Sequence, residues 1–258
     1  MSLIIGRKPV LEALNSSEKI DQVYILYGQQ GAVINSIIVA AKKKGVKVNQ
    51  VSYDKFKQLT KDKIAQGVAA LTSSYKFYSL QEIIEQAKSN YNKALSFGEG
   101  LGEALPLLLI LDSIQDTHNV GAILRSAECC GVNGIIITKH NSAPINETVV
   151  KTSAGAVEHV KICQVNNLVQ TIKELKENGF WIIGSALENS KPYTDIDYKI
   201  PAALIVGNEE KGIRKLTADN CDMVVSIPMR GKIQSLNVSV ATGILLFEIL
   251  RQRSITNN

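Results

Sequence analysis

The sequence predicts an α/β protein in which a small α/β unit precedes a larger domain built on a parallel sheet with helices on both faces. Three observations predict this fold. Apolar runs of strand length alternate with amphipathic stretches of helix length, and a glycine-rich stretch divides the chain into two parts. Apolar residues make up 45% of the 258 residues but aromatic residues only 5%, so the core must consist mainly of Val, Ile, Leu and Ala. Such near-continuous apolar strands are typical of parallel sheets that are buried on both faces.

The first part of the chain alternates between strands and helices as far as Tyr75. Periodicity predicts helices over 9–14, 33–45 and 54–60 and strands over 22–28, 46–52 and 67–75. Lysines occupy the last turn of the 33–45 helix, and Gly45 provides a left-handed stop after it.

A linker separates the two parts of the chain. Residues 79–95 have the spacing of an amphipathic helix capped by Ser79. The stretch that follows, 96–106, contains three glycines and a final proline, which is typical of a linker. We therefore divide the chain into a first domain (1–75), a helix with a glycine-rich linker (76–105) and a second domain (106–258).

The second domain alternates strand and helix more regularly. Strands are expected over 107–113, 134–139, 159–165, 181–187, 203–208 and 223–228, and a closing helix over about 238–253. In an open parallel sheet, ligands bind at the carboxyl ends of the strands. The loops that follow Leu111, Val206 and Ile227 are therefore the expected site.

Charge, hydropathy and cysteines exclude several classes of protein. The formal charge of +5 and the pI near 8.9 indicate only a mild preference for polyanionic partners. The longest apolar run, 105–111, is too short to span a bilayer and no targeting segment is evident, so we expect a soluble cytoplasmic protein without membrane contact. The four cysteines form no C-x-x-C pair, which argues against a metal site. The adjacent Cys129 and Cys130 are interpreted as buried apolar residues.

The loop after Leu111 leads into a helix that contains three candidate residues. Asn119 would cap the helix, and Gly121 would allow another group to approach the helix start closely. Arg125 lies six residues beyond Asn119. A capped helix with a solvated arginine would give the same pattern, so this loop alone leaves both interpretations open.

The other two loops are also weak evidence alone, and for residues 203–213 the purely structural interpretation is the stronger one. Residues 203–213 run from an apolar strand into Gly207 and a polar turn, which suits either a backbone cradle for a ligand or a tight turn. They lack the spacing of a nucleotide-triphosphate or dinucleotide loop. Ser235 would cap the closing helix, which leaves Asn237 in the first turn, where asparagine is a poor helix former. A second polar residue at this place indicates a ligand.

Residues 110–131, 204–213 and 226–248 resemble, in order and spacing, the three motifs of the SpoU/TrmH family of RNA ribose 2′-O-methyltransferases, which belongs to the knotted SPOUT class. With the N-terminal stretches IIGRKPVLEAL and IAQGVAA, the chain most resembles the bacterial 23S rRNA guanosine-2′-O-methyltransferase subgroup. It departs from the usual motifs at Thr117, where a proline is common. It also departs at Arg230, where a smaller residue is common and the arginine adds a candidate phosphate contact.

The resemblance implies a fold, a cofactor and an assembly. It implies a deep trefoil knot in the second domain and a small ribosomal-protein-like domain for RNA binding ahead of it. It implies that S-adenosylmethionine binds in the knot to backbone groups of Gly207, Ile227 and Leu236, without a metal. It further implies a homodimer in which Arg125 reaches toward the cofactor of the other subunit.

The resemblance also implies five catalytic residues: Asn119, Arg125, Glu209, Ser235 and Asn237. We expect Arg125 to hold the phosphate beside the target ribose and to stabilise the developing alkoxide, because a guanidinium stays protonated and is therefore a poor base. Asn119 and Asn237 would orient the ribose and Arg125. Glu209 would position Asn119 or its own loop, and Ser235 would orient the substrate.

The expected partner is RNA, with a guanosine of 23S rRNA as the first choice. A tRNA ribose methyltransferase, an antibiotic-resistance rRNA methyltransferase of the same family and a non-catalytic RNA-binding assembly factor stay open as alternatives. Candidate phosphate contacts in the first domain are Arg7, Lys8, Lys42, Lys43, Lys44 and Lys47. For at least half of these lysines a solvated helix end is the better explanation, and Arg7 and Lys8 have a similar status.

Overall fold

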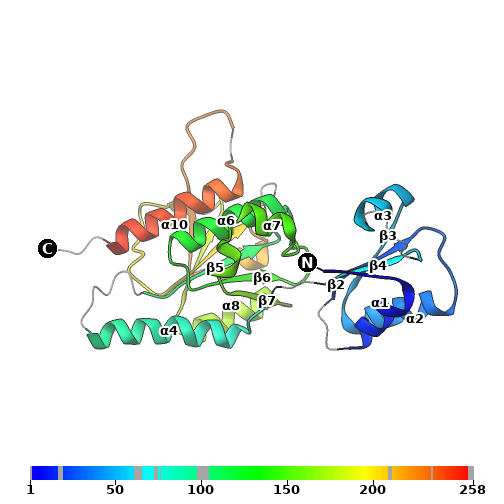
Figure 1. The fold of residues 1–258 in the computed structure, drawn as a ribbon. Helices are drawn as coiled ribbons and strands as arrows, with labels where there is room; N and C mark the ends of the chain where they lie inside the picture. The colour runs from blue at the N-terminus through cyan, green and yellow to red at the C-terminus, as the bar shows by residue number, and fades with distance from the viewer. Residues whose placement is uncertain are drawn as a thin grey trace. The chain divides into compact units, whose positions relative to one another are not determined.

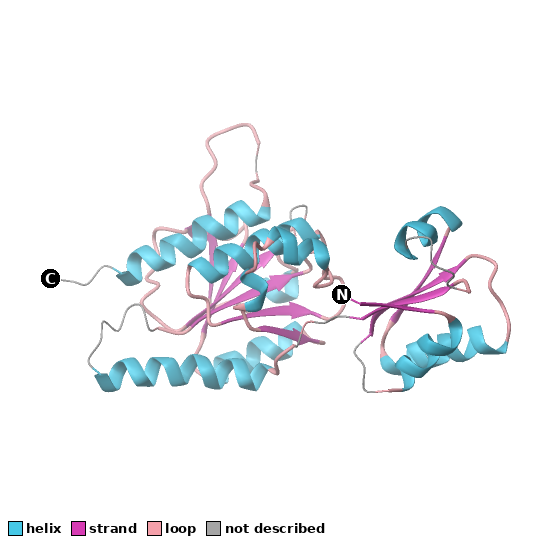
Figure 2. Ribbon diagram, in the orientation of Figure 1, coloured by secondary structure: helices cyan, strands magenta, loops and turns pink. Residues whose placement is uncertain are grey.

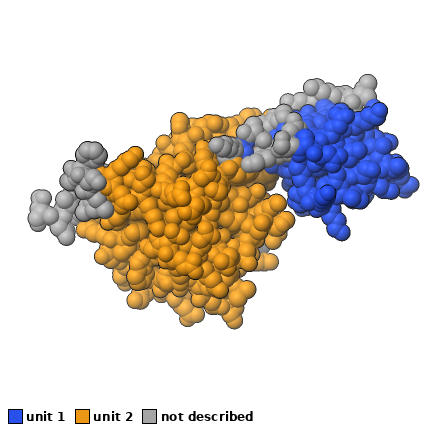
Figure 3. All heavy atoms as spheres, turned by 90° about the horizontal axis from the view of Figure 1, so that it is seen from below, with its two compact units in different colours: residues 1–76 blue, residues 77–258 orange. Residues whose placement is uncertain are grey.

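The computed structural model of the chain describes residues 2–16, 20–60, 66–72, 75, 77–97, 105–208, 211–233 and 235–254. The chain forms two compact units, residues 1–76 (unit 1) and 77–258 (unit 2), which Figure 3 shows in different colours. Each unit has its own hydrophobic core.

Unit 1 is a four-stranded sheet with helices on both faces. Its strands are β1 (Ser2–Ile5), β2 (Ile20–Leu26), β3 (Lys47–Val51) and β4 (Val68–Thr72), in the order β1-β4-β2-β3. Strands β2 and β3 run parallel, whereas β4 runs antiparallel to both β1 and β2. The helices are α1 (Arg7–Asn15), α2 (Ala32–Lys44) and α3 (Tyr53–Thr60).

Two clusters of apolar side chains hold unit 1 together. Val10 of α1 and Ile37 of α2 pack with Val23 of β2 on one face of the sheet, and Phe56 of α3 packs in a second cluster. The predicted helices and strands of this part are confirmed, and Gly45 ends α2 in the left-handed conformation (φ 69°). Strand β1 is not predicted from the sequence, because four residues are too few to show a period.

Unit 2 begins with α4 (Leu80–Phe97), which lies within the predicted linker range but packs into the core of unit 2. Ser79 and Glu82 form a capping box, in which the backbone N–H of Glu82 donates to Ser79 Oγ (3.2 Å) and that of Ser79 donates to Glu82 Oε2 (2.6 Å). Ile83 is fully buried against the sheet. The glycine-rich residues 98–104 lie outside the described part of the chain.

The core of unit 2 is a seven-stranded sheet in the order β7-β6-β5-β10-β8-β11-β9. Its strands are β5 (Leu107–Asp112), β6 (Gly134–Thr138), β7 (Ile162–Val165), β8 (Trp181–Ser185), β9 (Lys191–Pro192), β10 (Ala202–Gly207) and β11 (Met223–Ser226). Neighbouring strands all run parallel. The predicted parallel sheet is therefore confirmed.

Helices cover both faces of this sheet. Figures 1 and 2 show α6 (Thr117–Cys129), α7 (Glu147–Thr152) and α10 (Val238–Ser254) on one face and α4 with α8 (Leu168–Glu177) on the other. Every residue of β5 and β10 is buried, as a sheet covered on both sides requires. The short elements η1 (Ala156–Glu158), α7, α9 (Lys215–Ala218) and β9 are not predicted, because they are too short to show a period.

No helix in the described part of the chain is long and apolar enough to cross a membrane. The trefoil knot is not tested by the order of the strands and stays a prediction.

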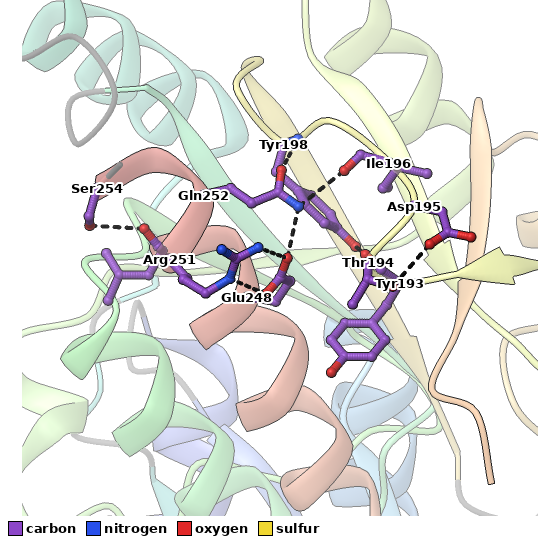
Figure 4. Close-up of polar contacts among 10 residues, drawn as sticks. Tyr193, Thr194, Asp195, Ile196, Tyr198, Glu248, Arg251, Gln252 and Ser254 are labelled. Carbon is purple, nitrogen blue, oxygen red and sulfur yellow. Dashed lines mark hydrogen bonds and ion pairs between the residues drawn. The ribbon is translucent and has the colours of Figure 1, made fainter. Parts of the chain in front are cut away.

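Polar contacts fix the C-terminal half of α10 against the segment that follows β9 (Figure 4). The Arg251 guanidinium donates two hydrogen bonds to Glu248, at 2.7 and 2.8 Å, and these bonds lower the pKa of Glu248. Gln252 donates to the Ile196 carbonyl (3.2 Å) and accepts from the backbone N–H of Tyr198 (3.1 Å). These contacts fix the axis of α10 and therefore the place where its first residues lie.

Arg253 anchors the last turn of α10. It is buried, and its guanidinium donates to the carbonyls of Leu105 (2.7 Å), Tyr198 (3.0 Å) and Ile200 (2.7 Å). Burial lowers the pKa of Arg253 to about 10, so the side chain is still charged at neutral pH. Arg253 therefore ties α10 to the start of β5 and to the segment before β10.

Candidate active site

The carboxyl ends of β5 and β10 lie side by side at the centre of the sheet. Gly207, the last residue of β10, pairs with Asp112, the last residue of β5. Asp112 is fully buried, and its carboxylate accepts from Nε of Arg214 (2.7 Å) and from the Arg214 backbone N–H (3.0 Å). This ion pair connects the loop after β5 to the segment after β10, so the first two predicted loops do converge. Because Arg214 engages both of its oxygens, Asp112 has a structural role.

Gly207 allows the chain to fold back tightly after β10. A Cβ atom at this position would lie 2.1 Å from the Gly212 carbonyl carbon and 2.2 Å from the Ile213 nitrogen. Asn208 and Gly212 exchange backbone hydrogen bonds of 3.1 and 2.8 Å, which close the loop between them. The predicted catalytic residue Glu209 belongs to this loop but lies outside the described residues.

Helix α6 is capped by Asp116, and the predicted capping role of Asn119 is wrong. The Asp116 side chain accepts from the backbone N–H of His118 (2.7 Å), so Thr117 is the first helical residue. Proline is favoured at this first helical position. Here the position is Thr117, and the aspartate cap fixes the helix start without a proline. Asn119 lies half-buried in the first turn, and its amide is not used for the cap.

Helix α10 is capped by Asn237, and the predicted capping role of Ser235 is wrong. The Asn237 carbonyl accepts from the backbone N–H of Ala241 (3.0 Å), and its side-chain oxygen accepts from the N–H (2.9 Å) and the hydroxyl (2.6 Å) of Ser239. The Asn237 amide nitrogen donates to Asn119 Oδ1 at 2.9 Å. Asn237 therefore starts α10 with its oxygen and joins α10 to α6 with its nitrogen.

Close packing explains the glycine in α6. A Cβ atom on Gly121 would lie 1.8 Å from the hydroxyl oxygen of Thr152 in α7. Gly121 therefore allows α7 to approach α6, so the predicted close approach at this glycine is confirmed and the approaching group is a neighbouring helix.

Arg125 is exposed on α6 and lies apart from the pair of asparagines. Within the described part of the chain, no residue forms a hydrogen bond or ion pair with its guanidinium. Six residues of α-helix place Arg125 about 120° around the axis from Asn119. The Arg125 side chain is therefore available to bind a group outside this chain.

Ile227, Ser235 and Leu236 flank the long loop between β11 and α10. Ile227 directly follows β11, Leu236 directly precedes the cap of α10, and both are half-buried, whereas Ser235 is exposed. Among the residues that the structure describes, none forms a backbone hydrogen bond with Ile227 or Leu236. Backbone N–H and C=O groups in a folded protein normally have partners, so the backbone of these two residues is a candidate to bind a ligand.

The buried cysteines are unsuited to nucleophilic chemistry. Burial raises the pKa of Cys130 and Cys163 to about 11 and that of Cys221 to about 12, so these thiols are protonated at neutral pH. Cys129 is exposed, so its predicted burial is wrong. In the described ranges, no three His, Cys, Asp or Glu side chains gather as a metal site requires.

Both units match known families. Residues 106–247 match the SpoU rRNA Methylase family, and residues 3–78 match the family described as RNA 2′-O ribose methyltransferase substrate binding. A Staphylococcus haemolyticus protein named for the TrmH family of tRNA/rRNA methyltransferases is 37% identical over 251 residues, which cover 97% of this chain and 96% of that protein.

Solved structures show the same fold. An AdoMet-bound rRNA methyltransferase from Sinorhizobium meliloti is 27% identical, with a TM-score of 0.59 over 96% of this chain and 86% of that chain. The TrmH/SpoU tRNA modifying enzyme of A. aeolicus is 32% identical, with a TM-score of 0.54 over 67% of this chain and 84% of that chain. The fold and its converging loops thus define an α/β methyltransferase domain of the SPOUT class that follows an RNA substrate-binding domain. The chain belongs to the SpoU/TrmH family of RNA methyltransferases.

Proposed function

We propose that the protein transfers a methyl group from S-adenosylmethionine to the ribose 2′-hydroxyl of a guanosine in 23S rRNA. The observation that supports this most directly is the 2.9 Å hydrogen bond between Asn237 and Asn119, which joins the third motif to the first. The strand of the second motif ends beside the strand of the first. Family membership supports the reaction class, and the AdoMet in the S. meliloti relative supports the cofactor.

The residues at the strand ends fit this cofactor. Ile227 and Leu236 form no backbone hydrogen bond with the residues described, and the missing side chain at Gly207 lets the backbone of Gly212 and Ile213 pack against the end of β10. Precisely placed N–H and C=O groups are typical of sites that fix the orientation of a small ligand. When bound, the cofactor supplies an electrophilic methyl carbon without a metal.

The protein must then align the ribose oxygen with that carbon and stabilise the developing alkoxide. The hydrogen bond between Asn119 and Asn237 fixes both side chains where the first and third motifs meet. We assign these two amides to orienting the ribose. Ser235, exposed two residues before the cap, orients the substrate, and Glu209 positions the second loop.

Arg125 provides positive charge in this proposal. A guanidinium remains protonated in a protein, so Arg125 stabilises the alkoxide and holds the neighbouring phosphate instead of removing the proton. Its lack of contacts to other described side chains supports this role, because the guanidinium keeps its donors for RNA.

The extent of the matches supports rRNA over tRNA as the proposed substrate. The S. meliloti rRNA methyltransferase matches 96% of this chain, whereas the A. aeolicus tRNA modifying enzyme matches 67%. Transfer to tRNA is the second candidate, since the S. haemolyticus relative is named for both RNAs. We place the reaction in the cytoplasm, where both RNAs are found.

Methyl transfer from tritiated S-adenosylmethionine to purified 23S rRNA and to tRNA tests this function. We expect label in 23S rRNA, at a guanosine 2′-oxygen identified by mapping the modified nucleotide. Calorimetry should show binding of S-adenosylmethionine and of its demethylated product. Label in tRNA alone would replace the proposed substrate, and the absence of binding heat at several temperatures would contradict the enzyme itself.

We also propose a homodimer, which the outer face of α10 supports. Val240 and Phe247 are 50% and 53% exposed, and with Ile244 they form an apolar stripe at helical spacing. An exposed apolar stripe of this kind on a helix is normally covered by another surface. Phe247→Glu should convert a dimer into a monomer of 28.1 kDa in sedimentation experiments, while Val150→Glu, at an exposed position of α7, should not. A monomeric wild-type protein would contradict the proposal.

A further inference from the structure

The positive charge of the chain is concentrated in unit 1. Residues 1–76 contain 12 Lys and Arg but only 5 Asp and Glu, a net charge of +7. Residues 77–258 contain 17 Lys and Arg and 19 Asp and Glu, a net charge of −2. The overall value of +5 therefore averages a basic unit with a slightly acidic one, and a polyanion is attracted mainly to unit 1.

Several turns of unit 1 lie together at one end of its strands. We call it the loop edge, and it consists of residues 6–8, 27–31, 52–55 and 66–67. Strands β1, β2 and β3 end there and β4 begins there, because Val51 pairs with Leu26 and the Leu26 N–H donates to the Gly67 carbonyl (2.9 Å). Helices α1, α2 and α3 begin at the same edge, so the positive ends of their dipoles add to its potential.

Two exposed tyrosines lie on the loop edge. Tyr27 follows β2 and Tyr53 begins α3, and their exposed fractions are 63% and 66%. The backbone N–H of Tyr27 donates to the carbonyl of Val51 (3.0 Å), which is two residues before Tyr53, so the two tyrosines are neighbours in the fold. A folded chain usually buries most of a tyrosine ring. Two exposed rings at one sheet edge therefore indicate a binding surface.

Basic side chains accompany the tyrosines at the loop edge. Arg7 donates from Nε to the Gln66 carbonyl (3.1 Å) and from Nη2 to the side chain of Gln29, which fixes the guanidinium between two loops. A guanidinium has five N–H donors, so others remain for a phosphate. Lys8 is exposed next to it in sequence. The loop edge thus combines aromatic rings with cations.

The other basic candidates of unit 1 lie at the opposite edge of the sheet. Lys44 donates to the carbonyls of Ala13 (3.0 Å) and Ser16 (2.8 Å) and closes the end of α1, so its role is structural. Lys42, Lys43 and Lys47 are exposed there, and no exposed tyrosine accompanies them in the described residues. Charge alone therefore does not distinguish the two edges; the tyrosines do.

We propose that Tyr27 and Tyr53 form a stacking platform for unpaired bases of the RNA, a proposal that rests on the proposed action on RNA. A-form duplexes hide the faces of their bases, whereas loops and bulges can place an unstacked base on an aromatic ring. Arg7 and Lys8 hold the phosphates that flank these bases. The match of residues 3–78 to a substrate-binding family supports RNA as the occupant of unit 1. The platform selects a loop or bulge over a continuous duplex.

Fluorescence anisotropy with the full-length protein tests the platform. The probes are a labelled RNA hairpin with an unpaired loop and the duplex of the same strand with its complement. We expect the wild type to prefer the hairpin. Tyr27→Ala and Tyr53→Ala should each weaken hairpin binding roughly 5- to 100-fold, from the usual contribution of a stacked base, and leave duplex binding unchanged. In methyl-transfer assays both variants should raise KM and leave kcat unchanged.

Two kinds of control variant show whether the loss of affinity comes from the aromatic rings themselves. Tyr27→Phe and Tyr53→Phe keep the ring and should retain hairpin affinity. Val39→Ala changes an apolar side chain of α2 that is 66% exposed and should have no effect. If the wild type methylates RNA but neither alanine variant weakens hairpin binding, the platform is wrong and the proposed function stands. If the wild type neither binds nor methylates RNA, both the platform and the proposed function are wrong.

Discussion

Arg125→Ala is expected to reduce methyl transfer about 10²- to 10³-fold, which is the usual cost of removing one group that stabilises charge in a transition state. The protein should remain folded, since Arg125 is exposed and forms no hydrogen bond or ion pair with other described residues. Binding of S-adenosylmethionine should also persist, because backbone groups of other segments are proposed to hold it. Methyl transfer, calorimetry and thermal unfolding measure the three quantities separately.

Two further substitutions in α6 show whether the loss comes from the guanidinium. Arg125→Lys keeps the charge but loses the forked donors, so we expect partial activity with a raised KM for RNA. Glu128→Ala alters an exposed residue of the same helix and should leave turnover unchanged. Full turnover in Arg125→Ala would remove this residue from the mechanism.

Gly207→Ala is expected to destabilise unit 2 by about 3 kcal/mol, at the upper end of the usual cost of overpacking. The added methyl group would overlap backbone atoms of Gly212 and Ile213, which cannot rotate away as a side chain can. A shift there would also strain the ion pair between Arg214 and buried Asp112. The midpoint of thermal unfolding should fall by about 6–12 °C, and binding of S-adenosylmethionine should be lost.

Following thermal unfolding by the fluorescence of Trp181 makes the measured midpoint specific to unit 2. This residue is the single tryptophan of the chain and lies in β8, which pairs with β10. The matched control is Gly243→Ala in α10, where a Cβ atom would meet nothing closer than Ser126 Oγ at 3.8 Å. A glycine-to-alanine change inside a helix should stabilise by up to about 1 kcal/mol. Equal effects of the two substitutions would show that the tight turn after β10 has no special role.

The sequence predicts the sheet of unit 2 well because its strands are apolar almost without interruption. Residues 107–112 and 203–207 of these runs are buried on both faces, so no alternation obscures them. Short elements are not predicted, because they have too few residues to show a periodic pattern. Helix α7, with six residues, completes less than two turns, and its position is fixed by close contact with α6 across Gly121 instead of by its own pattern.

At the candidate site, the sequence predicts the residues better than their local roles. Any polar residue near a helix start can look like a cap, so Ser235 and Asn119 are the natural choices. The actual caps are Asn237, two residues after Ser235, and Asp116, three residues before Asn119. The helix start depends on which residue first adopts helical backbone angles, and this in turn depends on tertiary contacts. The Asn119–Asn237 hydrogen bond spans 118 residues of sequence, and no local pattern contains it.

The position of β10 between β5 and β8 has a consequence for synthesis of the protein, because the ribosome makes β10 after both of its neighbours. Until residues 202–207 have emerged, β5 and β8 each present an open apolar edge, and such edges associate readily with other nascent chains. Unit 1 is complete well before this point and can already fold. The newly made chain is therefore most exposed to aggregation during a defined interval of translation, between the appearance of β5 and that of β10.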